Sequence, residues 1–161
     1  MISIRPTEAG DERALLAMAR AEPLFSAVEA DTVAELLHDY FHLPDHNGYL
    51  FLSAVEDARL LGFACYGPTP LTEGTFTVYW VCVDVAGRGR GIGRALMHAV
   101  EAGVQDSGGR LIVLDTSGRP AYAPTRAFYE RIGYTRTAAI PDYYSPGDDL
   151  VLFTRPLAAN T

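Results

Sequence analysis

The spacing of apolar and polar residues along the chain predicts a mixed α/β fold. Stretches with apolar residues at helical spacing alternate with short β-branched or aromatic stretches bounded by glycine, proline and polar turns. The predicted helices span about 7–21, 28–41, 92–107 and 124–132. The predicted strands lie near 2–5, 49–55, 60–67, 75–84, 110–116, 135–140 and 149–154. Residues 42–48 and the segment PDYYSPGD (141–148) are predicted to be connections.

The order of these elements predicts how the sheet is connected. Residues 111–114 are continuously apolar, as expected for a strand covered on both faces. A strand, helix and strand of this length form a right-handed crossover, so the strands at 75–84 and 110–116 should run parallel. We therefore expect a single domain over residues 1–161, with about seven strands in one mixed sheet flanked by about four helices.

Composition narrows the class of protein. The 161 residues are 48% hydrophobic and 20% charged, which is typical of a globular chain. The net charge of −7 argues against nucleic acid as a partner. Apolar runs are too short for a membrane helix and no leader pattern opens the chain, so we expect a cytoplasmic protein with no membrane partner. Cys65 and Cys82 lie in strand-like runs and are expected to be buried free thiols, and no metal site is predicted from the spacing of the four histidines.

The segment from Val81 to Leu96, VCVDVAGRGRGIGRAL, combines features of an anion site. A strand-like run ends in a loop whose glycines at 89, 91 and 93 allow a ligand to approach the main chain closely. The helix that follows directs free N–H groups and a partial positive charge toward the loop. Arg88, Arg90 and Arg94 add formal charge, so phosphate or pyrophosphate is the expected ligand.

Two well-known phosphate loops do not match these residues. A P-loop requires a lysine, and the chain contains none. A dinucleotide fingerprint beginning at Gly89 is broken by Arg94. The pattern Arg-x-x-Gly-x-Gly over 88–93 instead resembles the GCN5-related N-acetyltransferase (GNAT) family, in which loop amides hold the pyrophosphate of acetyl-CoA. For the loop alone, a glycine-rich turn that only caps a helix is the alternative.

A second segment extends the resemblance. TRAFYERIGY at 125–134 is similar to the family's other cofactor element, a helix that carries Phe-Tyr and ends at Gly followed by an aromatic residue. The two segments have the family's order and are some forty residues apart. The resemblance implies a GNAT-like fold and an acetyl-CoA-dependent N-acetyltransferase. Core packing of Phe128 and Tyr129 is the structural alternative for this helix taken alone.

The resemblance also implies which residues hold the cofactor. In the family, pantetheine pairs with the main chain of the strand before the glycine loop, and Val81 and Val83 are the matching positions here. Thr125 could supply a hydrogen bond to the cofactor or cap the helix. The implied cofactor-binding residues are Val81, Val83, Arg88, Gly89, Arg90, Gly91, Gly93, Arg94, Thr125 and Phe128.

The catalytic candidate is Tyr129. A phenol with an ordinary pKa near 10 stays protonated at neutral pH and can protonate a departing thiolate. Its hydroxyl could instead only orient the sulfur. Some family members carry a glutamate on the long strand at the position of Thr77, which cannot act as a base. Tyr79, Asp115 and Asp142 remain candidates through a water molecule, as does loss of the proton to bulk solvent.

The acceptor is less well defined by the sequence. Tyr122 stands where many relatives have an asparagine, and it could form a wall of the acceptor pocket. The stretch 141–153 resembles a loop and strand of some small bacterial acetyltransferases, and with loops at 23–25 and 41–46 it could form an aromatic, mildly acidic site or be a plain surface turn. The predicted acceptor-binding residues are Tyr79, Tyr122, Asp142 and Tyr143.

The predicted reaction is acetyl transfer to the primary amine of a small molecule, an amino acid or a peptide, in a protein that could form a homodimer. A non-catalytic CoA-binding or regulatory module and a protein N-terminal or lysine acetyltransferase are the alternatives.

Overall fold

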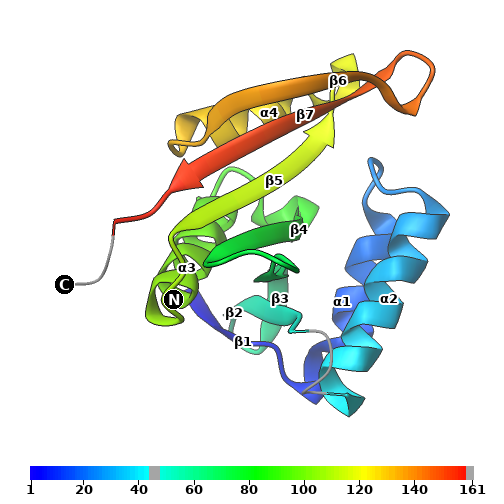
Figure 1. Cartoon of the computed structure of the whole chain (residues 1–161). Helices are drawn as coiled ribbons and strands as arrows, with labels where there is room; N and C mark the ends of the chain where they lie inside the picture. Colours follow the sequence, from blue (N-terminus) through cyan, green and yellow to red (C-terminus); the bar gives the residue numbers. More distant parts are fainter. Residues whose placement is uncertain (44–47, 159–161) are drawn as a thin grey trace.

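One seven-stranded mixed sheet organises the molecule, in the order β1-β2-β3-β4-β5-β7-β6 (Figure 1). The computed structural model describes residues 1–43 and 48–158. The strands are β1 (Ser3–Pro6), β2 (Leu50–Glu56), β3 (Arg59–Pro68), β4 (Thr75–Val83), β5 (Leu111–Ser117), β6 (Thr135–Ser145) and β7 (Asp148–Pro156). The helices are α1 (Glu12–Ala21), α2 (Ala27–His42), α3 (Ile92–Asp106) and α4 (Ala123–Arg131), with short 3₁₀ turns η1 (Ala9–Asp11), η2 (Val85–Gly87) and η3 (Pro120–Tyr122).

The predicted fold class is confirmed. All neighbouring strands pair antiparallel except β4 and β5, which run parallel and are joined through α3, as the crossover rule requires. The predicted elements agree with the observed ones to within a few residues, apart from the connection before β7.

That connection is shorter than the sequence suggests. Residues 141–145 belong to β6, so only Pro146 and Gly147 separate β6 from β7. The ladder is irregular between Ile140 and Ser145, and Asp142 has a φ of 55° there. This irregularity lets the strand continue past Pro141, a residue that normally ends a ladder.

Two hydrophobic clusters cover the two faces of the sheet. Under α1 and α2, the cluster includes Leu15, Leu37 and Phe63, all fully buried. On the other face, the cluster between α3, α4 and the sheet includes Leu96 and Phe153. Each helix pair therefore has a separate contact surface, and the sheet lies between them.

The remaining physical expectations concern cysteines and membranes. Cys65 and Cys82 are both buried and free, as predicted, and burial raises the pKa of the Cys82 thiol to about 12. None of the helices within residues 1–43 and 48–158 combines the length and the apolar character of a membrane span.

Leu96→Ala tests the importance of the α3 cluster. Leu96 is fully buried, so truncation leaves a cavity and should lower the free energy of unfolding by about 3 kcal/mol in urea denaturation. His98→Ala, at an exposed position on the same helix, should change it by less than about 0.5 kcal/mol. Equal effects of the two substitutions would contradict the packing described here.

Candidate active site

β4 and β5 separate along their length and leave an open edge in the middle of the sheet. They pair only where Thr75–Thr77 lies beside Leu111–Val113. Figure 1 shows the two strands diverging beyond this point, toward the side where α1 and α2 lie. From Val78 onward, β4 therefore has a strand partner only on the β3 side among the described residues. Main-chain N–H and C=O groups on the free edge are available to a ligand.

A β-bulge on β4 changes which residues face this edge. The register with β3 shifts between Cys65 and Tyr66, and Tyr79 is the extra residue on β4. Tyr79 and Trp80, although adjacent, consequently pack in the same cluster under α1 and α2.

The register beyond the bulge fixes the direction of the main chain at Val81 and Val83. Asp84 donates its N–H to the Leu61 carbonyl at 2.9 Å. Hydrogen-bonded and non-hydrogen-bonded positions alternate in an antiparallel ladder, so the main-chain groups of Val83 and Val81 point away from β3. Both residues thus offer an N–H and a C=O to the open edge, while their side chains pack toward α3.

The glycine loop lies between this edge and α3. Gly89 and Gly91 have φ values of 75° and 77°, and Gly91 is the N-cap of α3. A Cβ at either position would meet no atom within 4 Å, so the space beside the loop is open. In the described part of the chain, no acceptor lies in hydrogen-bonding geometry to the N–H groups of residues 89–94. This row of free donors at a helix N-terminus suits a phosphate group.

Two of the three loop arginines are engaged by carboxylates. Arg88 donates to Glu22, at the end of α1, at 2.8 Å. Arg90 donates to both oxygens of Glu56 on β2, at 3.0 and 2.8 Å. Arg94 is exposed and has no ion pair among residues 1–43 and 48–158. Within the described residues, the Arg94 guanidinium of the loop thus remains available to an anion.

α4 places its aromatic pair against the start of α3. A Cβ on Gly93 would come within 3.2 Å of the Phe128 ring, so this glycine allows the two helices to approach closely. Tyr129 is only 8% exposed and packs at 5.8 Å, between ring centroids, from Phe153. Its hydroxyl has no hydrogen-bond partner within the described ranges. Every fully buried side-chain oxygen or nitrogen in the described residues has a hydrogen-bond partner. The Tyr129 hydroxyl has none, so it must be accessible to solvent.

The chemistry of Tyr129 follows from this environment. Burial raises the pKa of its phenol well above the ordinary value, and the negative charge of Asp115 adds to the shift. The group is therefore a protonated donor at neutral pH. Thr77, at the position where some relatives have a glutamate, has its hydroxyl 2.7 Å from that of Thr69. Thr125 makes no hydrogen bond in the described part of the chain, so its hydroxyl is available.

The predicted acceptor residues make their contacts in different parts of the described structure. Tyr122 donates its hydroxyl to the Leu24 carbonyl at 2.7 Å and so ties the start of α4 to the α1–α2 connection. The Asp142 carboxylate accepts from the Gly147 N–H at 2.7 Å, a role within the β6–β7 turn. Tyr79 has its ring 5.2 Å from that of Tyr49 and, among the described residues, forms no hydrogen bond or ring contact with Tyr122 or Asp142. Residues 44–46 of the predicted loop at 41–46 lie outside the described residues.

Tyr143 and its neighbour occupy the exposed face of β6. Tyr143 is 56% exposed and its ring is 5.0 Å from that of Tyr144, edge to face. Tyr144, and not Tyr143, reaches β5, where its hydroxyl donates to Asp115 at 2.5 Å. The sequence analysis missed this pair and the Glu22 partner of Arg88, because neither long-range contact leaves a local pattern in the sequence.

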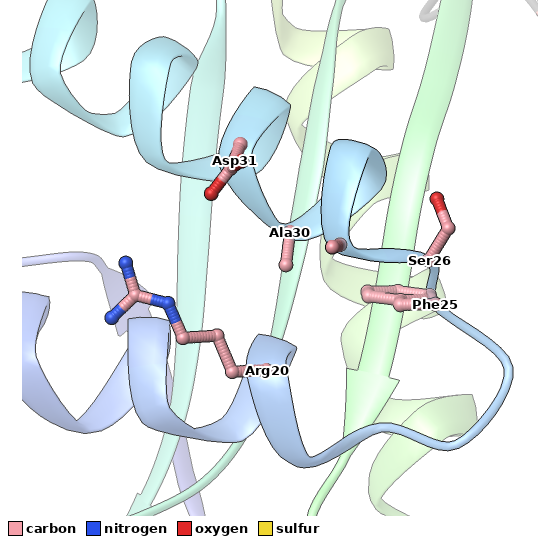
Figure 2. A pocket seen from close by; sticks show the side chains of 6 residues that line it. Arg20, Phe25, Ser26, Ala30 and Asp31 are labelled. Atoms are coloured by element: carbon pink, nitrogen blue, oxygen red, sulfur yellow. The ribbon is translucent and has the colours of Figure 1, made fainter.

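A pocket of about 280 Å³ lies elsewhere, between α1 and α2 (Figure 2). Arg20 from α1 and Ala30 and Asp31 from α2 line it, together with Phe25 and Ser26 from the connection. None of these residues belongs to the β4–β5 edge, so the pocket is separate from the site described above.

Comparison with known proteins agrees with the geometry. Residues 14–134 match the model of the Acetyltransferase (GNAT) family. A crystal structure of a GNAT-family protein from Desulfovibrio desulfuricans is 37% identical, with a TM-score of 0.94 over 98% of this chain and 100% of that one. No curated protein matches the chain significantly.

More distant structures share the fold. The ribosomal-protein-S18-alanine N-acetyltransferase of Escherichia coli is 19% identical, with a TM-score of 0.78 over 100% of this chain and 97% of that one. An aminoglycoside 6′-N-acetyltransferase complexed with coenzyme A is 18% identical, with a TM-score of 0.77 over 99% of each chain. On the strength of the family match and the 37% identical structure, the chain belongs to the GNAT family of acetyltransferases, which use acetyl-CoA.

Proposed function

We propose that residues 1–161 form one N-acetyltransferase domain that moves an acetyl group from acetyl-CoA directly to a primary amine of a small molecule, an amino acid or a peptide. The observation that carries the proposal is the open edge of β4, where the main chain of Val81 and Val83 faces outward beside the free N–H groups of residues 89–94. The names of two structural relatives specify amine acceptors, a ribosomal-protein alanine and an aminoglycoside.

The chemical groups at this edge are of the kinds that bind the phosphates and amides of acetyl-CoA. The N–H groups of residues 89–94 and the guanidinium of Arg94 bind the pyrophosphate, and Gly89 and Gly91 leave room for it. Arg88 and Arg90 add positive charge although each has a carboxylate partner. Val81 and Val83 bind the pantetheine amides in the manner of an added strand. Phe128 packs beside the loop, and Thr125 offers a free hydroxyl to the cofactor.

Acetyl-CoA, when bound, supplies an acetyl group activated as a thioester. Tyr129 holds a proton on a hydroxyl that reaches solvent, and we assign it as the donor of that proton to the departing sulfur. A role limited to orienting the sulfur would use the same hydroxyl. Thr77 cannot accept a proton at neutral pH, so the incoming amine loses its proton to solvent or, through water, to a nearby carboxylate.

A non-catalytic acetyl-CoA-binding module is the second candidate, favoured by the threonine at position 77 and its hydrogen bond to Thr69. Such a protein would bind acetyl-CoA without releasing thiol in the presence of any amine. Acetylation of a protein side chain or N-terminus is a third candidate, and it would be recognised by peptides that outcompete free amines.

Gly91→Ala should weaken acetyl-CoA binding. The added Cβ would fill the open space beside the loop that the pyrophosphate needs, so the dissociation constant in calorimetric titration should rise about tenfold. Gly10→Ala, at an exposed glycine with no atom near its added Cβ, should leave it unchanged. Absence of binding by the parent at millimolar acetyl-CoA would exclude the proposed function.

Tyr129→Phe should lower kcat by about a hundredfold and leave the acetyl-CoA dissociation constant within about twofold, because the substitution removes only the proton donor. Turnover is measured as thiol release over a panel of amines, aminoglycosides and peptides. Tyr66→Phe, at another buried tyrosine of the same cluster, is the matched control and should retain parental turnover. Equal kcat in parent and Tyr129→Phe would remove Tyr129 from the mechanism.

The pH dependence of kcat should reflect the raised pKa of Tyr129. A general acid works in its protonated form, and a pKa shifted upward keeps the phenol protonated from neutral pH to beyond about pH 10. With acceptor saturating, this group should therefore cause no fall in kcat up to about pH 10. A fall in kcat below about pH 10 that is absent in Tyr129→Phe would show that the phenol loses its proton at a lower pH than its buried environment predicts.

A further inference from the structure

The pocket between α1 and α2 combines an apolar surface with two side chains of opposite charge. Its apolar part is formed by Ala30, which is 5% exposed, and by Phe25, which packs on the cluster under α1 and α2. Arg20 and Asp31 are exposed and line the same pocket. Figure 2 shows the guanidinium of Arg20 and the carboxylate of Asp31 extending into the space between the two helices.

The two charges do not neutralise each other. No ion pair or hydrogen bond joins Arg20 to Asp31, and neither side chain has another such partner within residues 1–43 and 48–158. The guanidinium carries several N–H donors in a plane that matches a carboxylate, and the aspartate oxygens accept from an ammonium group. Both charges are therefore available to a ligand in the pocket.

The wall of the pocket that carries Phe25 is held in place by hydrogen bonds. Phe25 donates its N–H to the Glu22 carbonyl at 3.1 Å, and the Glu22 carboxylate accepts from the Leu24 N–H at 3.2 Å. Ser26 and Glu29 form a capping box at the start of α2, with bonds of 3.1 and 2.7 Å. A ligand that binds here meets a preformed wall, so little binding free energy is lost in ordering it.

The volume of the pocket limits the size of the ligand. Pockets that hold drug-sized molecules span roughly 300–1,000 Å³. This pocket, at about 280 Å³, suits a smaller molecule. Such a molecule matches the lining when it carries a carboxylate for Arg20, an ammonium group for Asp31 and a short apolar part for Phe25. Free amino acids combine these three groups.

We propose that the pocket between α1 and α2 binds a small zwitterion with an apolar body, such as a free amino acid, with its carboxylate on Arg20 and its ammonium group on Asp31. The pocket shares no residue with the β4–β5 edge. The molecule bound here is therefore not the acetyl acceptor, and the inference does not rest on the proposed function.

The test is an NMR titration that follows the main-chain amide signal of Ala30, which reports on the pocket itself. The proteins are the parent, Arg20→Gln, Asp31→Asn and two controls, Arg13→Gln and Glu35→Gln. The control positions are exposed on the same two helices and do not line the pocket. All four substitutions are at exposed positions, so each variant should unfold in urea as cooperatively as the parent.

The ligands are two zwitterions with different charge spacing, L-leucine and ε-aminocaproate, and their counterparts with a single charge. Isoamylamine and isocaproate each retain one charged group of leucine, and hexylamine and caproate each retain one charged group of ε-aminocaproate. Comparison within each set separates recognition of the carboxylate from recognition of the ammonium group.

At least one of the two zwitterions should shift the Ala30 signal of the parent to saturation. Its single-charge counterparts should bind about tenfold more weakly or worse, because each loses one charge-assisted hydrogen bond. Arg20→Gln and Asp31→Asn should each raise the dissociation constant of the zwitterion about tenfold, and the controls should stay within about twofold of the parent. In Arg20→Gln, the advantage of the zwitterion over the matching amine should disappear.

Absence of a saturable shift of the Ala30 signal with both zwitterions would overturn the inference. Parental dissociation constants in Arg20→Gln and Asp31→Asn would also overturn it. A zwitterion that shifts the amide signals of Val81 and Val83 but not that of Ala30 would bind at the β4–β5 edge, and this result would equally contradict a site between α1 and α2.

Discussion

The constraint on which the site depends is that β4 and β5 cannot remain paired. Each is held along its length by an antiparallel neighbour, β4 by β3 and β5 by β7. Only three residues of each strand are close enough to pair with the other. Beyond them, an unpaired edge lies in the interior of a sheet, where main-chain donors and acceptors must find water or a ligand. The bulge at Tyr79 then selects Val81 and Val83 as the residues that present those groups.

The glycine loop is connected to both sides of the molecule by ion pairs. Arg88 reaches Glu22 at the end of α1, and Arg90 reaches Glu56 on β2. Both pairs are partly exposed, so solvent screens them and they contribute little to stability. They therefore orient the loop but hold Arg88 and Arg90 only weakly. An anionic ligand can compete with the carboxylates for both arginines. The main-chain donors need no such exchange, since they have no acceptor in the described structure.

The sequence specifies the glycine loop and its neighbouring strands more closely than it specifies the acceptor side, for a physical reason. Glycine positions, a strand end and a helix start are local features. Residues adjacent in sequence were therefore enough to predict the loop at 88–94 and the parallel strands around it. The contact of Tyr144 with Asp115 depends on a register across β7 and on an irregularity at residues 140–145. The partner of Tyr122, Leu24, is 98 residues away in sequence. No periodicity encodes such contacts.

The glycine loop and the diverging part of β5 also differ in charge. The loop presents main-chain N–H groups, the N-terminus of α3 and Arg94, which has no ion pair among the described residues, and all of these attract an anion. On the diverging part of β5, Asp115 presents an unneutralised negative charge. Tyr129, buried and protonated, lies on α4 next to Phe128, which packs on the loop. The gap between β4 and β5 is thus bordered by positive charge at the glycine loop and by negative charge at Asp115, and α4 adds the protonated phenol of Tyr129.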